Sequence, residues 1–213
     1  MWLVYIPRYD ETVEADSITM DFRLNAVSTA QISFTEFLVL PVWSKLTDMF
    51  VIGDPIQIKY KDQVVFNGFV YQANTTKTQT GYQLNVTLQD PLGKLVKLAY
   101  KGGFSGKLQD LIETEICPYI NIKNRIQSDA IVNLRYEKEV TRFSLLHDAC
   151  AIARYQTNPA SFGFYYNHKL NALCELNDPE AQEPLVSISN RNRLSINQSH
   201  GYIITNIVQV RNY

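Results

Sequence analysis

Glycine-rich sequence precedes Lys107 and is the segment that most resembles a phosphate-binding loop. Gly102, Gly103 and Gly106 lie just before this lysine, and Leu108 follows it. A phosphate loop needs Ser or Thr after the lysine, because that hydroxyl binds magnesium, and its glycines are spaced differently. The segment also lacks the Gly-x-Ser-x-Gly order of a hydrolase nucleophile elbow. The sequence therefore predicts a flexible link into a helix rather than a nucleotide site.

The three histidines do not predict a metal centre. His147, His168 and His200 lie in a predicted helix, a hairpin turn and a loop, and no second histidine lies two to four positions from any of them. Structural zinc sites usually combine ligands at such short spacings. We therefore expect structural or surface roles for these residues, no bound metal and no cofactor.

Three carboxylates on one predicted helix could suggest paired acid and base groups. Asp110, Glu113 and Glu115 mostly fall on the side opposite Leu108 and Leu111. An amphipathic helix places its charged residues on this solvated side. The sequence therefore predicts no catalytic residue here, and we expect a protein that is not an enzyme.

The cysteines are three in number and widely spaced, at Cys117, Cys150 and Cys174. A chain of this length does not need disulfides to fold, so we expect free, buried or half-buried thiols, a reducing compartment and no dependence of the fold on oxidation. Cys150 lies between Ala149 and Ile152 on an apolar stripe. This position indicates a small core residue rather than an activated thiolate.

Aromatic residues at 164–166 could form a platform that stacks against a sugar ring. Along a strand, however, Phe164, Tyr165 and Tyr166 point alternately to opposite faces. The pattern therefore favours core residues on one face and surface residues on the other. A carbohydrate-binding module stays open as an alternative.

The composition indicates a folded, β-rich chain. Its 213 residues are 46% hydrophobic and include 13 Tyr and 10 Phe, which supply a core and suit a pleated sheet. The net charge of −1 gives no broad positive field for nucleic acid phosphates, so we expect no sequence-specific nucleic acid contact. No run approaches the roughly 20 apolar residues of a membrane span, and residues 1–8 lack the basic lead of a signal peptide, so we expect no membrane insertion.

Alternating apolar and polar residues predict short antiparallel strands in the first 90 or so positions. The strand candidates are 18–24, 31–37, 56–66 and 82–88, with a turn at Asn25 and Ser28, a turn at Lys61 and Asp62, and a helical or irregular excursion at 41–46. Gly68, inside a returning strand, indicates a bulge or a barrel corner. Five or six strands of this length close economically into a small barrel.

Helical spacing replaces the alternation between residues 105 and 157. Ser105 is the expected N-cap of a first helix that ends at Pro118, and a second helix starts near Ser144 with an apolar stripe that includes Leu145 and Leu146. Strand patterns occur at 131–136, in a hairpin at 162–176, and at 186–188, 194–196 and 203–210.

These elements predict a mainly β fold with inserted helices, built from two small antiparallel barrels. We expect a first barrel domain at residues 1–95 and a helical connection at 96–128. A second barrel-like domain with one inserted helix follows at 129–213.

The order of several segments resembles the baseplate hub proteins of contractile phage tails, the late control gene D family, which is related to the spike protein of type VI secretion. The segments that carry the resemblance are the Gly-Asp entry at 53–58, the Phe-x-Gly-x-Val return at 65–70, the helix at 105–117, the helix that starts within 141–150, the hairpin at 162–170 and the Asn-x-Val-x-Val strand at 206–211. Together they span most of the chain, from about 17 to 211.

Two features depart from the pattern of that family. Family members usually continue beyond a strand like 206–211, and Ser144 is followed by Ala149 and Ile152 where the pattern has larger or differently spaced apolar residues. We therefore expect a reduced second barrel and no continuation into a spike needle.

The resemblance implies a mechanical role. In that family three subunits with two similar barrels each form a ring of pseudo-sixfold symmetry, which joins a hexameric tail tube to a trimeric spike. It therefore implies a homotrimer whose partners are the tail tube protein and the central spike protein, located in the virion baseplate and assembled in the cytoplasm of the bacterial host. Partner-binding residues do not follow from it. A tail-tip adaptor of a noncontractile phage, a carbohydrate-binding module and an unrecognised enzyme are the alternatives.

Overall fold

The computed structural model describes residues 2–36, 46–79, 81–156, 163–176, 178, 195–198 and 205–211. The chain forms two compact units. Unit 1 comprises Met1–Phe22, Ser28–Asp90 and Leu185–Tyr213, and unit 2 comprises Arg23–Val27 and Pro91–Pro184. The short connection between two strands of unit 1 therefore belongs to unit 2.

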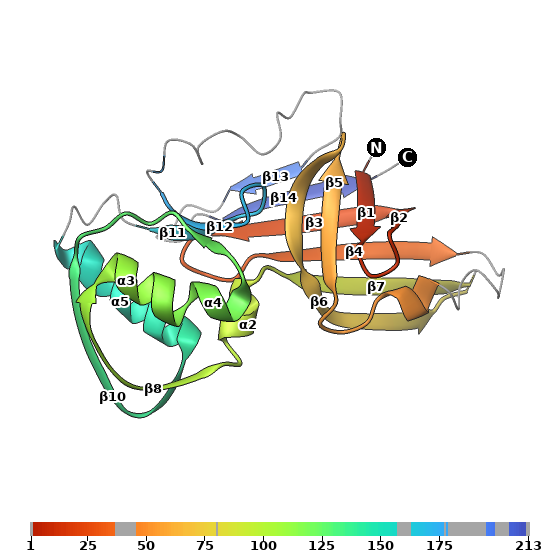
Figure 1. The fold of residues 1–213 in the computed structure, drawn as a ribbon. Helices are drawn as coiled ribbons and strands as arrows, with labels where there is room; N and C mark the ends of the chain where they lie inside the picture. The colour runs from red at the N-terminus through yellow and green to blue at the C-terminus, as the bar shows by residue number, and fades with distance from the viewer. Residues whose placement is uncertain are drawn as a thin grey trace. The chain divides into compact units, whose positions relative to one another are not determined.

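Unit 1 is built on one nine-stranded sheet (Figure 1). Its strands are β1 (Trp2–Ile6), β2 (Glu11–Glu14), β3 (Ser17–Arg23), β4 (Thr29–Glu36), β5 (Pro55–Tyr60), β6 (Gln63–Lys77), β7 (Tyr82–Gln89), β13 (Ser195–Gln198) and β14 (Thr205–Arg211). They lie in the order β13-β14-β3-β4-β7-β6-β5-β1-β2. The predicted strands of the first 90 residues are confirmed. The predicted turn at Lys61 and Asp62 joins β5 to β6, with both residues at positive φ, as a tight hairpin turn requires.

Alternation along these strands gives unit 1 its core. Inward residues of β3 and β4, such as Ile18, Met20 and Ile32, are buried, and they belong to one cluster with residues of β1, β5, β6 and β7. Most of this cluster comes from one face of the sheet, which curls around it, and Met49 and Phe50, between β4 and β5, also contribute. Burial of apolar residues on this face therefore stabilises unit 1, as burial between two packed sheets stabilises a β-sandwich.

The predicted closed barrel is wrong. β13 and β2 are the two edges of the sheet in the described chain, and no pairing joins them. The two-residue alternation of apolar and polar residues determines which face of each strand is buried, but it does not determine whether the first and last strands pair. A curled, open sheet satisfies the same pattern.

Gly68 marks a close approach of two strands. A Cβ atom built on this residue would lie 2.2 Å from the carbonyl oxygen of Gln89 and 2.8 Å from the Phe66 ring. The register of β6 shifts elsewhere, opposite the Ile58–Lys59 step of β5 and again between Val70 and Gln72. The bulges that bend this long strand therefore flank Gly68, and the glycine itself is required by space.

Unit 2 surrounds its helices with two small sheets. The helices are α2 (Leu92–Leu95), α3 (Leu108–Glu115), α4 (Cys117–Ile120) and α5 (Arg142–Gln156). The strands β8 (Ala99–Lys107) and β10 (Ile131–Thr141) form an antiparallel pair, and β9 (Lys123–Asn124), β11 (Phe164–Asn167) and β12 (Ala172–Glu175) form a three-stranded sheet. Residues from all four helices share one buried cluster. The predicted hairpin at 162–176 and the strand at 131–136 are confirmed, the latter within the longer β10.

The first predicted helix is shorter than its sequence suggested. Gly102–Lys107 is not a flexible link but part of β8, and the Ser105 hydroxyl bonds Asn133 on β10 rather than capping a helix. Helix α3 starts at Leu108, and Pro118 lies in the first turn of α4 instead of ending the run. Proline has no N–H, and the first turn of a helix is where that loss costs least.

The second predicted helix is confirmed as α5. The Thr141 hydroxyl accepts a hydrogen bond from the Ser144 amide at 3.0 Å, which satisfies one of the free N–H groups of the first turn. Leu145, Leu146 and Ala149 are fully buried along one side of the helix. The cap therefore lies three residues before the predicted start at Ser144.

The two units divide the chain differently from the predicted domains. Residues 96–128, predicted as a connection, contribute α3 and α4 to the unit 2 core, while β13 and β14 belong to the unit 1 sheet instead of a second barrel. The second predicted barrel is therefore wrong. The excursion at 41–46, apart from residue 46, and the strand at 186–188 lie outside the described residues. Within the described residues, no helix has the length and apolar character that crossing a membrane requires.

Candidate functional site

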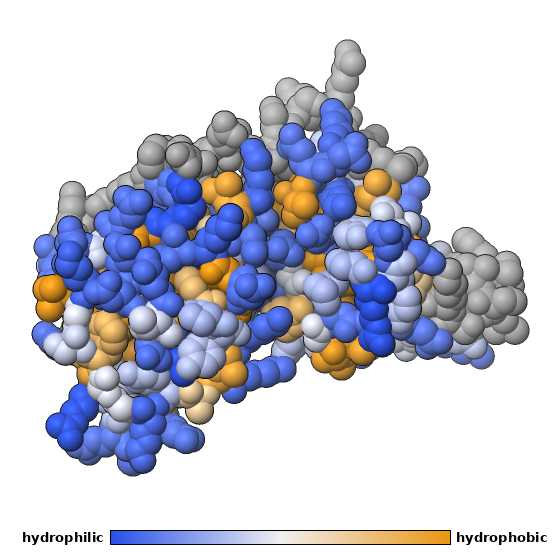
Figure 2. Space-filling model, viewed as in Figure 1, coloured by the Kyte–Doolittle hydropathy of each residue, from blue (hydrophilic) through white to orange (hydrophobic). Residues whose placement is uncertain are grey.

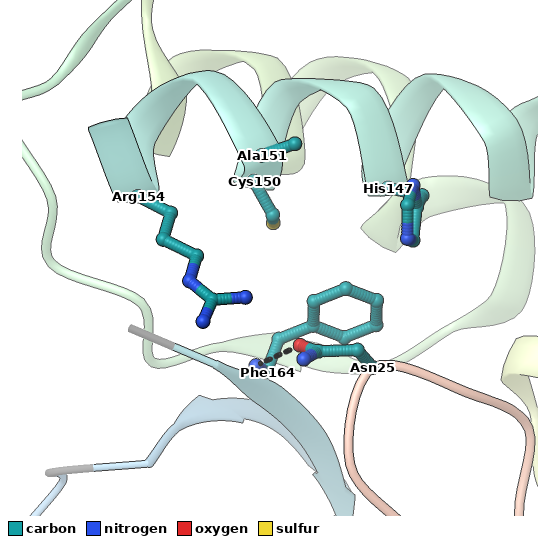
Figure 3. Close-up of a pocket in the computed structure, with 6 residues that line it drawn as sticks. All are labelled: Asn25, His147, Cys150, Ala151, Arg154 and Phe164. Atoms are coloured by element: carbon teal, nitrogen blue, oxygen red, sulfur yellow. Dashed lines mark hydrogen bonds between the residues drawn. The ribbon is translucent and has the colours of Figure 1, made fainter. Parts of the chain in front are cut away.

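A small cavity lies beneath α5 in unit 2 (Figure 3). Its volume is about 100 Å³, and it is lined by Asn25, His147, Cys150, Ala151, Arg154 and Phe164. Every one of these residues belongs to unit 2. The cavity is therefore a property of that unit alone.

Helix α5 supplies one wall because of its spacing. His147, Cys150 or Ala151, and Arg154 lie at positions i, i+3 or i+4, and i+7, which share one face of a helix. Figure 3 shows His147 and Arg154 extending from α5 toward β11, on either side of Cys150. The side next to this face, with Leu145 and Ala149, packs into the core.

Asn25 and Phe164 form the opposite wall. The backbone N–H of Asn25 donates to the Phe164 carbonyl oxygen at 2.8 Å. In return, the backbone N–H of Phe164 donates to the side-chain Oδ1 of Asn25 at 2.8 Å. Asn25 adopts a φ of 56°, a left-handed conformation that asparagine tolerates better than most residues. Its predicted turn is confirmed, and the turn also anchors a strand 139 residues away in the sequence.

Charge is distributed unevenly around the cavity. Arg154 is exposed, and the His147 side chain is 55% exposed. None of the six lining residues is acidic. The neighbouring carboxylate is Asp148, whose Oδ1 lies 3.7 Å from His147 Nδ1 and whose Oδ2 accepts a hydrogen bond from the Tyr136 hydroxyl at 2.6 Å. The lining therefore carries hydrogen-bond donors at its rim.

The thiol of Cys150 is not activated. The residue is 5% exposed, and its burial raises the pKa of the thiol well above the ordinary value. Burial likewise raises the pKa values of Cys117 and Cys174 to about 12. All three cysteines are buried and free, as the sequence predicts. These thiols are therefore neutral near pH 7 and poor nucleophiles.

Glu115 departs from the solvated face predicted for it. Its Oε2 lies 2.8 Å from Nη1 of Arg142, which also donates to the Glu115 carbonyl oxygen at 2.7 Å. The Arg142 guanidinium lies 3.4 Å from the centroid of the Tyr119 ring. Asp110 and Glu113 are exposed, as predicted. The cluster of Arg142, Glu115 and Tyr119 ties α3, α4 and α5 together, which is a structural role.

The remaining residues considered from sequence do not converge. His168 is buried in the turn after β11, with its ring 4.8 Å from that of Tyr166, and His200 lies outside the described residues. Tyr166 is 2% exposed and Tyr165 is half-buried, so the two rings do not form an open sugar platform. Among the described residues, no group of three or more His, Cys, Asp or Glu side chains could hold a metal ion.

Sequence reasoning did not identify Asn25, Arg154 and Phe164 as neighbours. The helical spacing of His147, Cys150 and Arg154 was a usable signal, because it places all three on one face. The contribution of Asn25 had no local signal. The cavity is smaller than the roughly 300–1,000 Å³ of pockets that take drug-sized ligands. It therefore suits a small chemical group.

Comparisons with known proteins concern the fold. No protein-family model matches the sequence, and no curated protein matches it. Among solved structures, the chain is similar to a tail protein from Neisseria meningitidis MC58, with 14% identity, a TM-score of 0.63, and 94% of this chain and 61% of that one covered. It is also similar to the 43 kDa tail protein of prophage MuSo2 from Shewanella oneidensis, with 14% identity, a TM-score of 0.61, and 82% and 53% covered.

A third similar structure is the E. coli c3393 protein, a component of the type VI secretion system that is itself structurally similar to the T4 bacteriophage tail proteins gp27 and gp5. It shows 12% identity and a TM-score of 0.52, with 92% of this chain and 56% of that one covered. The chain thus spans between 53% and 61% of the length of these three structures. It shares its fold with them.

Proposed function

We propose that this protein is a structural subunit of a phage tail or a related contractile injection machine. The observation that carries the proposal is the fold, which matches a phage tail protein over 94% of this chain. Because that match covers nearly the whole chain, it includes residues of both units. The function follows by analogy of fold.

The specific role that we propose is that of a baseplate hub. Three copies form a ring that adapts the tail tube to the central spike, and the chain performs no catalysis. The ordered motifs at 53–58, 65–70 and 206–211 support this role, since they resemble the hub family. The subunit acts in the virion baseplate after assembly in the host cytoplasm.

An exposed apolar surface on unit 1 supports a role in assembly. Tyr9, Val51, Ile52 and Tyr71 are between 40% and 67% exposed, and we call them the Ile52 surface. Gly53 donates to the Val70 carbonyl oxygen at 2.8 Å, which brings the chain at Ile52 beside that at Tyr71. Figure 2 shows hydrophobic side chains at the surface near the lower ends of β5 and β6. Exposed clusters of apolar side chains often mark surfaces that bind another protein.

Electron microscopy of the purified protein tests the proposed hub. Negatively stained particles should show rings with threefold symmetry and a central opening. Filaments, or compact particles of single chains at every concentration, would argue against a hub.

A variant tests the Ile52 surface. Ile52→Asp places a charge on the 67% exposed residue, so it should weaken subunit association without unfolding the chain. Tyr155→Asp is the matched control, because Tyr155 is 86% exposed on unit 2. Equal loss of rings in both variants would remove the Ile52 surface from the proposal.

A further inference from the structure

The cavity beneath α5 combines hydrogen-bond donors at its rim with an apolar floor, and this combination suits one class of ligand. We propose that the cavity binds a carboxylate group together with the one or two methylene groups next to it. This inference goes beyond the proposed hub function and does not depend on it, because every lining residue belongs to unit 2.

Three side chains can donate to the carboxylate. Arg154 has a planar guanidinium with five N–H groups, so it can bind a carboxylate alongside other partners. Asn25 uses Oδ1 to accept from the Phe164 amide, while its Nδ2 carries two further donors. His147 adds a ring N–H from the other end of the cavity (Figure 3). The paired N–H groups of an arginine can donate two parallel hydrogen bonds to the two oxygens of a carboxylate, whereas a group with a single oxygen accepts less well.

The floor explains why a carboxylate is favoured over an inorganic anion. Phe164, Ala151 and Cys150 contribute an aromatic ring, a methyl group and a neutral thiol. Phosphate has no apolar part that could use this surface, whereas acetate and propionate have one. None of the six described residues that line the cavity is acidic, and Asp148, which lies beside it, accepts a hydrogen bond from the Tyr136 hydroxyl.

The size of the cavity sets the length of the ligand. A volume of about 100 Å³ accepts a carboxylate and a short aliphatic stem but excludes a larger molecule. An acidic side chain from a protein partner and a free small acid share this chemistry. Any larger part of the ligand must lie outside the cavity.

Titrations followed by NMR test the proposal on the full chain. The ²H,¹⁵N-labelled protein is titrated separately with acetate, propionate and inorganic phosphate, at an ionic strength held constant with chloride. Saturable shifts should occur at the amides of Asn25, Phe164 and residues 147–154, with a Kd for acetate of roughly 10 mM. Propionate should bind about threefold to fourfold more tightly, since it buries one more methylene. Phosphate should bind more weakly than acetate.

Matched variants separate binding in the cavity from general charge effects. Arg154→Gln should weaken propionate binding at least tenfold, whereas Arg135→Gln removes the same charge from the exposed face of β10 and should change nothing. Ala151→Met keeps every charge but fills the cavity, so it should abolish the saturable shifts. Equal affinity for phosphate and propionate, or binding that survives Ala151→Met, would overturn the proposal.

The last arm distinguishes the two sources of the carboxylate. A blocked tripeptide, acetyl-Gly-Glu-Gly-amide, carries its acid only on a side chain. Saturable binding of this peptide at the same amides supports an acidic side chain of a protein as the natural occupant. Binding of propionate without binding of the peptide supports a free small acid. If neither binds, the proposal is wrong.

Discussion

Asn25 shows how one residue can hold two distant segments together. It accepts from and donates to the backbone of Phe164, and its positive φ suits an asparagine. The start of β11 therefore depends on a side chain from the connection between β3 and β4. This dependence gives the first prediction at the residue scale.

We expect Asn25→Ala to destabilise unit 2. It leaves the Phe164 amide without its acceptor, at a cost of about 1–3 kcal/mol, and places alanine in a left-handed conformation, at about 1 kcal/mol more. Asn25→Asp retains an acceptor and tolerates this conformation, so it should lose less than half as much. Urea unfolding of both variants provides the measurement, and equal losses would contradict the role given to the side chain.

Arg142 gives the second prediction at this scale. Its side chain is 10% exposed and that of Glu115 is 29% exposed, so Arg142→Met leaves Glu115 partly buried without its cation. We expect a loss of about 2–3 kcal/mol, below the value for a fully buried pair because water reaches Glu115. Lys107→Met breaks an exposed pair with Asp129 and should have little measurable effect. Comparable losses in thermal unfolding would argue against the buried pair as an anchor.

The residues of the cavity were only partly predictable from sequence. His147, Cys150 and Arg154 could be placed on one helix face, because helical periodicity is local. Asn25 and Phe164 meet over 139 residues, and nothing in either local pattern encodes that meeting. Glu115 was predicted as solvated because its partner, Arg142, lies on another helix. Local patterns therefore identify faces of elements but not the contacts between them.

Strands and helices show the same limit at the scale of elements. Alternation predicted β3, β4, β5 and β7 because their inward residues enter one core. It did not predict β8, where Gly102, Gly103 and Gly106 carry no side chain to alternate. Pairing with β10 makes this glycine-rich segment a strand. Tertiary hydrogen bonds override local propensity in such segments.

Gly68 gives the prediction at the scale of elements. We expect Gly68→Ala to destabilise unit 1 by about 3 kcal/mol or more, because its Cβ would lie 2.2 Å from the backbone oxygen of Gln89 and would push β6 and β7 apart. Gly106→Ala is the matched control in another strand, since there the Cβ meets only the Phe104 ring, at 3.2 Å. Denaturant unfolding of the two variants should show at least a threefold difference in loss.

All three buried thiols of the chain, those of Cys117, Cys150 and Cys174, lie in unit 2. Unfolded thiols ionise near pH 9.0, whereas burial keeps Cys117 and Cys174 neutral up to about pH 12 and raises the pKa of Cys150 in the same direction. The folded chain then holds more protons than the unfolded chain between these values. The contribution of these thiols to the stability of the folded chain is therefore fully present below pH 9, and it is lost as the pH rises above that value.

This linkage predicts alkaline unfolding of unit 2. The free energy of unfolding, measured with urea and reductant at pH 8 and pH 10, should fall, with Cys150 alone contributing up to about 1.4 kcal/mol per pH unit. Circular dichroism at 222 nm reports mainly on unit 2, because α2, α3, α4 and α5 all belong to it. Cys150→Ala should reduce the slope with pH by the share of one group. An unchanged slope would show that this thiol does not titrate on unfolding.

Whole-molecule architecture was the least predictable level. The mainly β class with helices follows from the periods of the sequence, and it is confirmed. The two closed barrels are wrong, since β13 and β14 extend the sheet of unit 1. A sequence pattern gives the face that each strand buries, whereas the partner of an edge strand depends on segments far away.

Light scattering on a size-exclusion peak tests the proposed hub role most directly. A hub must assemble with itself, and an obligate interface of this kind buries upward of about 2,000 Å². At about 1 µM, we predict the mass of three chains of 24.5 kDa, about 74 kDa. A single peak at 24.5 kDa, with cooperative unfolding and no increase in mass at tenfold higher concentration, would contradict the assignment.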